Sequence, residues 1–127
     1  MRIQPIEYSR KDDRGILIQV ITGKFKQLTM LAVKKGAKLG GHFHLKKKEV
    51  FYLLTGDITL SIRDKIKTKQ IRLVSKKQPP LTCVVVDEHE VHSITANEDS
   101  MLVRIATEPF TEEDTFTLGV GKCQKTH

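Results

Sequence analysis

The chain has 127 residues, enough for about one domain that buries a hydrophobic core without help from disulfides or a metal. Hydrophobic residues make up 39% and charged residues 29%, too apolar for a disordered chain and too charged for a membrane-embedded one. The net charge of +7 favours anionic partners such as phosphates and nucleotide-linked substrates. No basic helix or zinc finger accompanies the lysines, so we expect no nucleic-acid partner and no membrane partner.

Short β-branched or alternating segments recur along the chain and predict strands. They cover residues 16–21, 28–33, 49–54, 58–62, 69–74, 82–86, 91–96 and 101–106. Turns are predicted at 56–57, 63–64 and 97–99, where glycine, aspartate or asparagine interrupts the pattern. The prediction is an all-β fold, a sandwich or a barrel, in which Cys83 fills the core.

The chain ends differ from this pattern. Residues 111–117 have the composition of one short helix, and residues 119–127 are expected to fray. We predict a single domain over 1–127 with its core at about 12–110. The strand at 16–21 has no obvious neighbour, and an unpaired edge invites a second chain, so we expect a homodimer. Two cysteines and no apolar signal-peptide core predict a cytoplasmic protein.

Four of the five histidines lie in two clusters, and the first cluster has the spacing of a metal site. His42 and His44 are two residues apart and therefore share one face of a strand. Glu49 opens the next strand, and His92 lies about forty residues later. Three imidazoles and a carboxylate suit Zn, Fe(II), Mn, Ni or Cu. We therefore predict one divalent ion, with zinc as the first choice, at His42, His44, Glu49 and His92.

The first cluster resembles the first motif of the cupin superfamily. Its fixed positions, Gly-x5-His-x-His-x4-Glu-x6-Gly, are filled by Gly36, His42, His44, Glu49 and Gly56. The resemblance implies a jelly-roll β-barrel, of a single cupin domain, with inward metal ligands.

The second cupin motif, Gly-x5-Pro-x-Gly-x2-His-x3-Asn, is matched only in part. His92 occupies the position of the motif histidine. Leu81, Asp87 and His89 stand where glycine, proline and glycine are usual, and Asn97 lies one residue late. The expected metal ligand is kept, whereas the usual turn before it is not.

A narrower resemblance covers most of the chain. The segment 12–15 (Asp-Asp-Arg-Gly), the Gly-His-Phe-His sequence and the tail at 101–110 ending in Glu-Pro-Phe are similar to the C-terminal cupin domain of capsular-polysaccharide UDP-sugar reductases. That domain binds zinc and epimerises a keto sugar carried on UDP. The 12–15 segment is also similar to stand-alone nucleotide-sugar epimerases and ketoisomerases. The resemblance implies a small-molecule substrate, a nucleotide sugar, and a role in polysaccharide biosynthesis.

Epimerisation beside a ketone needs an electrophile for the enolate oxygen, which a metal can supply, and a base for the carbon-bound proton. If Glu49 binds the metal, the candidate bases are His89, Tyr52 and Tyr8. We favour His89 because it lies three residues before His92, whereas Tyr52 alternates away from Glu49 along its strand.

Other residues have weaker expectations. Lys46, Lys47 and Lys48 either contact a diphosphate or form a solvated hairpin tip. Asp87 and Glu90 are candidates for orienting an imidazole. Phe43 and Val50, like Tyr52, should face away from the ligands and pack on a second sheet or subunit.

Two alternative functions use the same ligands. The first is a metal-dependent dioxygenase, because this ligand set also holds Fe(II) with open coordination positions. The second is a non-catalytic module that binds a sugar or another small ligand. Oxygen consumption would identify the first, and ligand binding that survives metal removal would identify the second.

Overall fold

The computed structural model describes residues 1–63, 67–76, 79–117 and 121–122 of the chain. It confirms the all-β prediction, with strands joined by short connections and one turn of 3-10 helix, η1 (Glu112–Asp114). The strands are β1 (Arg2–Pro5), β2 (Tyr8–Asp12), β3 (Gly15–Gln19), β4 (Gln27–Val33), β5 (Lys38–Phe43), β6 (Glu49–Arg63), β7 (Thr68–Ser75), β8 (Thr82–Val86), β9 (Val91–Ala96), β10 (Ser100–Ala106), β11 (Phe116–Thr117) and β12 (Gly121–Lys122).

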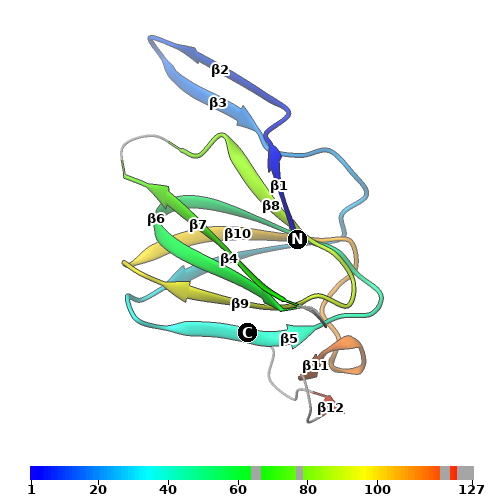
Figure 1. The fold of residues 1–127 in the computed structure, drawn as a ribbon. Coiled ribbons are helices and arrows are strands. Elements are labelled where there is room, and N and C mark those ends of the chain that lie inside the picture. The colour runs from blue at the N-terminus through cyan, green and yellow to red at the C-terminus, as the bar shows by residue number, and fades with distance from the viewer. Residues whose placement is uncertain (64–66, 77–78, 118–120, 123–127) are drawn as a thin grey trace.

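Two antiparallel sheets share the long strand β6 and enclose the core (Figure 1). The amino-terminal half of β6 lies between β8 and β10, and this first sheet has the order β1-β8-β6-β10-β4. The carboxyl-terminal half lies between β7 and β9, and the second sheet has the order β7-β6-β9-β5-β11-β12. A strand that passes from one sheet to the other closes a corner of the barrel.

The predicted turn at 56–57 is wrong, because β6 runs through it without a break. Near this point the pairing of β6 with β10 shifts register, from Leu53↔Leu102 to Thr55↔Met101. The bulge changes which residues face inward, from odd positions such as Leu53 to even positions such as Ile58. Gly56 has φ +115 and packs so closely on Ser100 that an added Cβ would lie 2.6 Å from its Cα. Glycine here permits a bend between the sheets, not a reversal.

The interior of the barrel is filled by the inward residues of both sheets, including Phe51, Leu60 and Leu102, all at most 2% exposed. A second cluster covers the outer face of the first sheet. There Val50, Tyr52 and Cys83 pack beneath residues 18–25 of the same chain. The predicted outward orientation of Val50 and Tyr52 is thus confirmed, as is the buried Cys83, and their cover is a segment of this chain.

The segment predicted at 16–21 is β3, and the expectation that it lacks a neighbour is wrong. It pairs with β2 along its whole length, from Tyr8↔Gln19 to Asp12↔Gly15. The resulting hairpin stands clear of the two sheets (Figure 1), and almost all of its residues are exposed. The sequence pattern missed β2 because its alternation is polar on both faces.

The end of the chain follows its prediction in part. The segment 111–117 contains η1, whose N-cap Thr111 accepts a hydrogen bond from the Asp114 amide, and then the short strand β11. Phe116 of β11 stacks on Phe43 with 5.4 Å between ring centroids. The predicted fraying of 119–127 and the turn at 63–64 fall largely outside the described residues. Within the described part of the chain, no helix is long and apolar enough to cross a membrane.

Candidate metal centre

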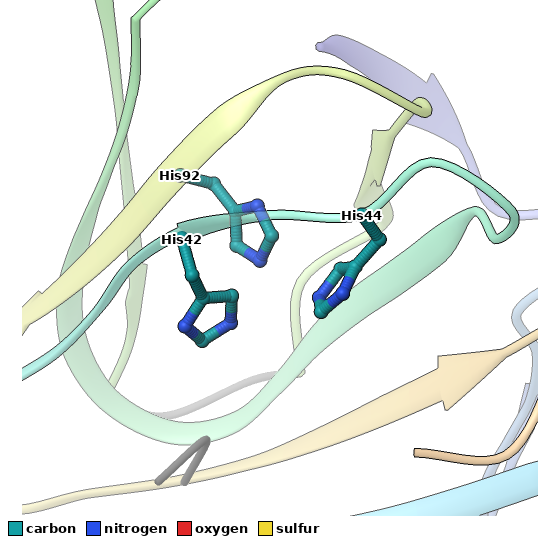
Figure 2. A group of neighbouring side chains, drawn as sticks. All are labelled: His42, His44 and His92. Atoms are coloured by element: carbon teal, nitrogen blue, oxygen red, sulfur yellow. The ribbon is translucent and has the colours of Figure 1, made fainter. Parts of the chain in front are cut away.

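Three histidines meet inside the barrel, near the end of β5 (Figure 2). His42 is on β5, His44 follows that strand, and His92 is on β9. Their ring centroids are 4.9–5.6 Å apart, and one nitrogen of each lies within 4.8 Å of the others. All three side chains are buried.

A β-bulge in β5 turns His42 into the barrel. Leu39 and Gly40 pair with Ile94 and Ser93, but the next pair is His42↔His92, so Gly41 is the extra residue. Directly paired residues share a face of the sheet, and His92 faces inward; without the bulge, His42 would face outward. The two glycines adopt φ of +94 and +87, which non-glycine residues rarely adopt.

Glu49 completes the group from the first residue of β6, with only 1% of its surface exposed. Its Oε1 lies 3.1 Å from His44 Nε2 and 3.0 Å from His92 Nε2. The structure therefore brings together all four residues that the sequence predicts as ligands.

Backbone carbonyls hold two of the imidazoles in place. His44 Nδ1 lies 2.8 Å from the Asp114 carbonyl oxygen, and His92 Nδ1 lies 3.0 Å from that of Glu90. A carbonyl can only accept, so the proton of each neutral ring is assigned to Nδ1. Each Nε2 then carries a lone pair directed at the cluster, the arrangement typical of metal-binding histidines.

The unsatisfied polar atoms of this group fit a metal ion. His44 Nε2 and both carboxylate oxygens of Glu49 are buried without a hydrogen-bond partner. Buried polar atoms normally have one, so these atoms are suited to bind something else. Two ligands bonded to one ion at about 2.0 Å lie about 3.3 Å apart in a tetrahedral site. The contacts of 3.0 and 3.1 Å from Glu49 to the imidazoles are close to that spacing.

The environment of His42 keeps this donor in its metal-binding form. Burial, assisted by His92 and His44, lowers the pKa of His42 to about 3, so its imidazole is neutral near pH 7. A neutral imidazole is the form of histidine that binds a divalent cation.

Two buried cations, Arg104 and Lys47, lie near Glu49. The sequence analysis assigned no role to Arg104 and treated Lys47 as either a diphosphate contact or part of a solvated hairpin tip. Arg104, on β10, places its Nε 3.3 Å from Glu49 Oε2. It is the one charged residue in an otherwise apolar strand segment, and that was its signal in the sequence. Lys47 is only 4% exposed, whereas Lys46 and Lys48 are exposed, as expected of a hairpin tip. Burial lowers the pKa of Lys47.

A small cavity adjoins the histidines and has a volume of about 20 Å³ for the centre of a water-sized sphere. His42, His92 and Arg104 line it, together with apolar side chains that include Phe51. One water needs about 10–15 Å³ by this measure. The space therefore suits an ion and its water.

The three candidate bases lie in different places. His89 is exposed in the β8–β9 turn, and its backbone N–H donates to the His44 carbonyl at 2.7 Å. Tyr52 lies on the opposite side of the sheet from the histidines, where its hydroxyl donates to the Pro80 carbonyl at 2.8 Å. Tyr8 is 48% exposed on the projecting hairpin. Of the three, only His89 has its backbone bonded to a residue of the cluster.

His89 has φ +68 and is the one non-glycine residue with positive φ in the described chain. It stands where the second cupin motif carries glycine. The turn therefore holds a histidine in a left-handed backbone conformation, which costs a non-glycine residue about 1 kcal/mol or more.

Asp87 and Glu90, which the sequence analysis named as candidates for orienting an imidazole, have other carboxylate partners. Glu90 holds His92 through its backbone carbonyl, while its carboxylate accepts from the Asp87 amide at 2.7 Å. Asp87 forms ion pairs with Arg2 at 2.7 Å and Lys48 at 3.8 Å. Neither carboxylate orients an imidazole.

Comparison with known proteins agrees with this fold. Residues 10–118 match the family model of the polysaccharide biosynthesis C-terminal domain. No curated protein sequence matches the chain significantly.

Solved structures of similar fold include enzymes that act on nucleotide sugars. One is the 3,4-ketoisomerase QdtA from Thermoanaerobacterium thermosaccharolyticum in complex with TDP, with 23% identity, a TM-score of 0.79, and coverage of 91% of this chain and 85% of that one. A 3,4-ketoisomerase from Helicobacter canadensis has 18% identity, a TM-score of 0.80, and coverage of 91% and 88%. The Mycobacterium tuberculosis rmlC epimerase has 14% identity, a TM-score of 0.78, and coverage of 93% and 68%.

These likenesses establish the cupin fold, and the family match spans most of the sequence. The chain therefore belongs to the family of polysaccharide biosynthesis C-terminal domains.

Proposed function

We propose that this protein epimerises or isomerises a keto sugar carried on a nucleotide, with one divalent ion held by His42, His44, Glu49 and His92. The observation that carries the proposal is the buried donor group, in which His44 Nε2 and both carboxylate oxygens of Glu49 lack hydrogen-bond partners. The family match and the ketoisomerases and epimerases of similar fold support the substrate class. Zinc is the first choice, with iron, manganese and nickel as alternatives.

A bound divalent ion would act as a Lewis acid toward the keto oxygen of the substrate. The protein's own residues would do the rest. His44 and His92 are held by backbone carbonyls, so their rings need not reorganise when substrate arrives. His89 is the proposed base: it takes the proton from the carbon beside the ketone, and the proton returns to the other face or to the neighbouring carbon. The small size of the cavity beside the histidines supports a position for the nucleotide at the barrel mouth.

The test is solvent deuterium incorporation into UDP- and TDP-4-keto-6-deoxy sugars, followed by NMR, with protein loaded in turn with zinc, iron, manganese or nickel. We expect exchange above the rate without protein. His42→Ala should lose both metal and exchange. His89→Ala should keep the metal and lose exchange by roughly 10²–10⁴-fold, the usual contribution of a general base. Exchange that His89→Ala leaves unchanged would show that His89 is not the base.

The absence of exchange with every metal and sugar would contradict the proposal. Oxygen consumption by the iron-loaded protein would then favour a dioxygenase. Sugar-nucleotide binding that survives metal removal would favour a binding module.

We also propose that the protein is a homodimer. On the outer face of the first sheet, Leu28 is 63% and Met30 58% exposed, and Met101 extends the same apolar stripe. Residues 18–25 cover the rest of that face, and the β2–β3 hairpin projects with little support from its own chain. An isolated two-stranded hairpin is only marginally stable in water, so contact with a second copy would stabilise both surfaces. Sedimentation showing only a 14.4 kDa species at micromolar concentration would contradict this.

A further inference from the structure

His44 differs from the other two histidines of the cluster because its backbone lies outside the strands. His42 and His92 are paired across β5 and β9, so the sheet fixes the backbone of both. His44 follows the end of β5, and its position depends on contacts with other parts of the chain. The His89 amide donates to its carbonyl, and Asp114 supplies further contacts.

Asp114 holds three consecutive residues of the loop that follows β5. Its backbone carbonyl lies 2.8 Å from His44 Nδ1 and accepts the proton assigned to that nitrogen. Its carboxylate accepts hydrogen bonds from the backbone amides of Leu45 and Lys46, one to each oxygen, at 2.9 and 3.1 Å. Hydrogen bonds to a charged acceptor are about twice as strong as those between neutral groups. One residue therefore holds both the imidazole and the backbone that follows it.

Asp114 is itself anchored beside β5. Its amide donates to Thr111 Oγ1 at 3.2 Å, and the buried Thr115 hydroxyl donates to the Thr111 carbonyl at 2.8 Å. The next strand, β11, pairs with β5 at Phe116↔Phe43, and these two rings stack. The carbonyl and the carboxylate of Asp114 are thus fixed relative to the strand that carries the first histidine of the cluster.

We propose that Asp114 is a positioning residue of the metal site, which holds the His44 ring in place and in the tautomer that directs Nε2 at the other donors. Hydrogen-bond partners of this kind typically contribute 10- to 100-fold to metal affinity. The inference rests on the proposed function for the identity of the bound ion. It gives the segment 111–117 a part in the site, although the proposed ligands all lie elsewhere in the chain.

Zinc affinity, measured by competition with a chromophoric chelator, tests this role. Asp114→Ala removes both carboxylate contacts, whereas Asp114→Asn keeps one of the two acceptor oxygens. Glu112→Ala and Glu113→Ala remove a negative charge from exposed positions of the same turn and are the matched controls. We expect Asp114→Ala to weaken zinc binding by roughly 10- to 100-fold, and Asp114→Asn by less. The controls should change it less than about twofold, because exposed charges are screened.

A second measurement needs neither metal nor substrate. Long-range proton–nitrogen NMR correlations distinguish the two imidazole tautomers in the metal-free protein, and the His44 signals are assigned by their loss in His44→Gln. The wild type should show the Nδ1-protonated form, and Asp114→Ala a mixture of both forms, with a cooperative melting transition retained. A role in stability alone would lower Tm and leave the tautomer unchanged. If Asp114→Ala does not fold, Asp114→Asn provides the same comparison.

Three results would overturn the inference: wild-type zinc affinity in Asp114→Ala, a loss of affinity that Glu113→Ala reproduces, or a His44 tautomer that Asp114→Ala leaves unchanged. The same proteins separate this inference from the proposed function. If Asp114→Ala loses zinc affinity and changes the tautomer while no keto sugar exchanges deuterium, the positioning role stands and the proposed reaction is wrong. If keto sugars exchange deuterium and Asp114→Ala binds zinc as tightly as the wild type does, the reaction stands and the role of Asp114 is wrong.

Discussion

Replacing His89 by glycine should separate the energetic cost of its left-handed backbone conformation from the proposed role of its imidazole as a base. The residue has φ +68, and a left-handed conformation costs a non-glycine residue about 1–2 kcal/mol. Glycine removes that cost but adds about 0.5–1 kcal/mol of conformational entropy to the unfolded chain. The ring is exposed, so little packing is lost. The free energy of unfolding should stay the same or rise by up to about 1 kcal/mol.

His89→Ala is the matched control, because it removes the imidazole and keeps the unfavourable backbone. We expect His89→Gly to be more stable than His89→Ala by about 1 kcal/mol, a difference of roughly 2–6 °C in Tm. Both variants should lose deuterium exchange to the same extent and keep the metal.

Thermal melting followed by circular dichroism, together with the NMR exchange assay, measures both quantities. A His89→Gly protein destabilised by more than about 1 kcal/mol would refute the argument, because the side chain would then be retained for structure. Full exchange activity in His89→Gly would refute the role as base.

Three other outcomes are expected. Removing the metal with a chelator should lower Tm but leave a cooperative transition and a folded protein at 25 °C, since the barrel has an apolar core of its own; an apo protein without a transition would contradict this. The Arg72 guanidinium and the Asn97 amide hold the pKa of Asp57 at about 2. This carboxylate therefore adds stability above about pH 4, and the contribution is lost as the pH falls toward 2. In urea titrations, Asp57→Asn should lower the free energy of unfolding by about 1 kcal/mol at pH 7, and the difference should disappear near pH 2. Gly40→Ala should destabilise the folded protein by about 2 kcal/mol or more and weaken its metal affinity, because the added Cβ would lie 2.7 Å from the His92 carbonyl oxygen. Zinc competition with a chromophoric chelator measures the metal affinity, and an unchanged affinity would contradict this prediction.

The local pattern of the sequence predicts most strands correctly. Alternation in 58–62 and 101–106 reports burial on one face, and the structure has these segments within β6 and β10. The spacing of His42, His44 and Glu49 is equally local. Together with His92, it indicated the group of residues that the structure brings together.

The sequence prediction was wrong where one local pattern is compatible with two structures. At Gly56 the apolar residues change from odd to even positions, which is typical of either a turn or a β-bulge. The pairing of β6 with β10 shows that it is a bulge. The polar segment 8–12 has no signal of burial, because its neighbour is a hairpin partner and not a core.

The sequence by itself determined the all-β architecture and the identity of the four donor residues, because alternation and spacing are properties of neighbouring residues. Only the tertiary structure decided which way those donors face. The bulge at Gly41 turns His42 toward His92, and the carbonyl of Asp114, seventy residues away in the sequence, holds the ring of His44. Tertiary packing also distinguished Lys47 from the exposed lysines beside it, since burial of one lysine in a run depends on Phe110, more than sixty residues away.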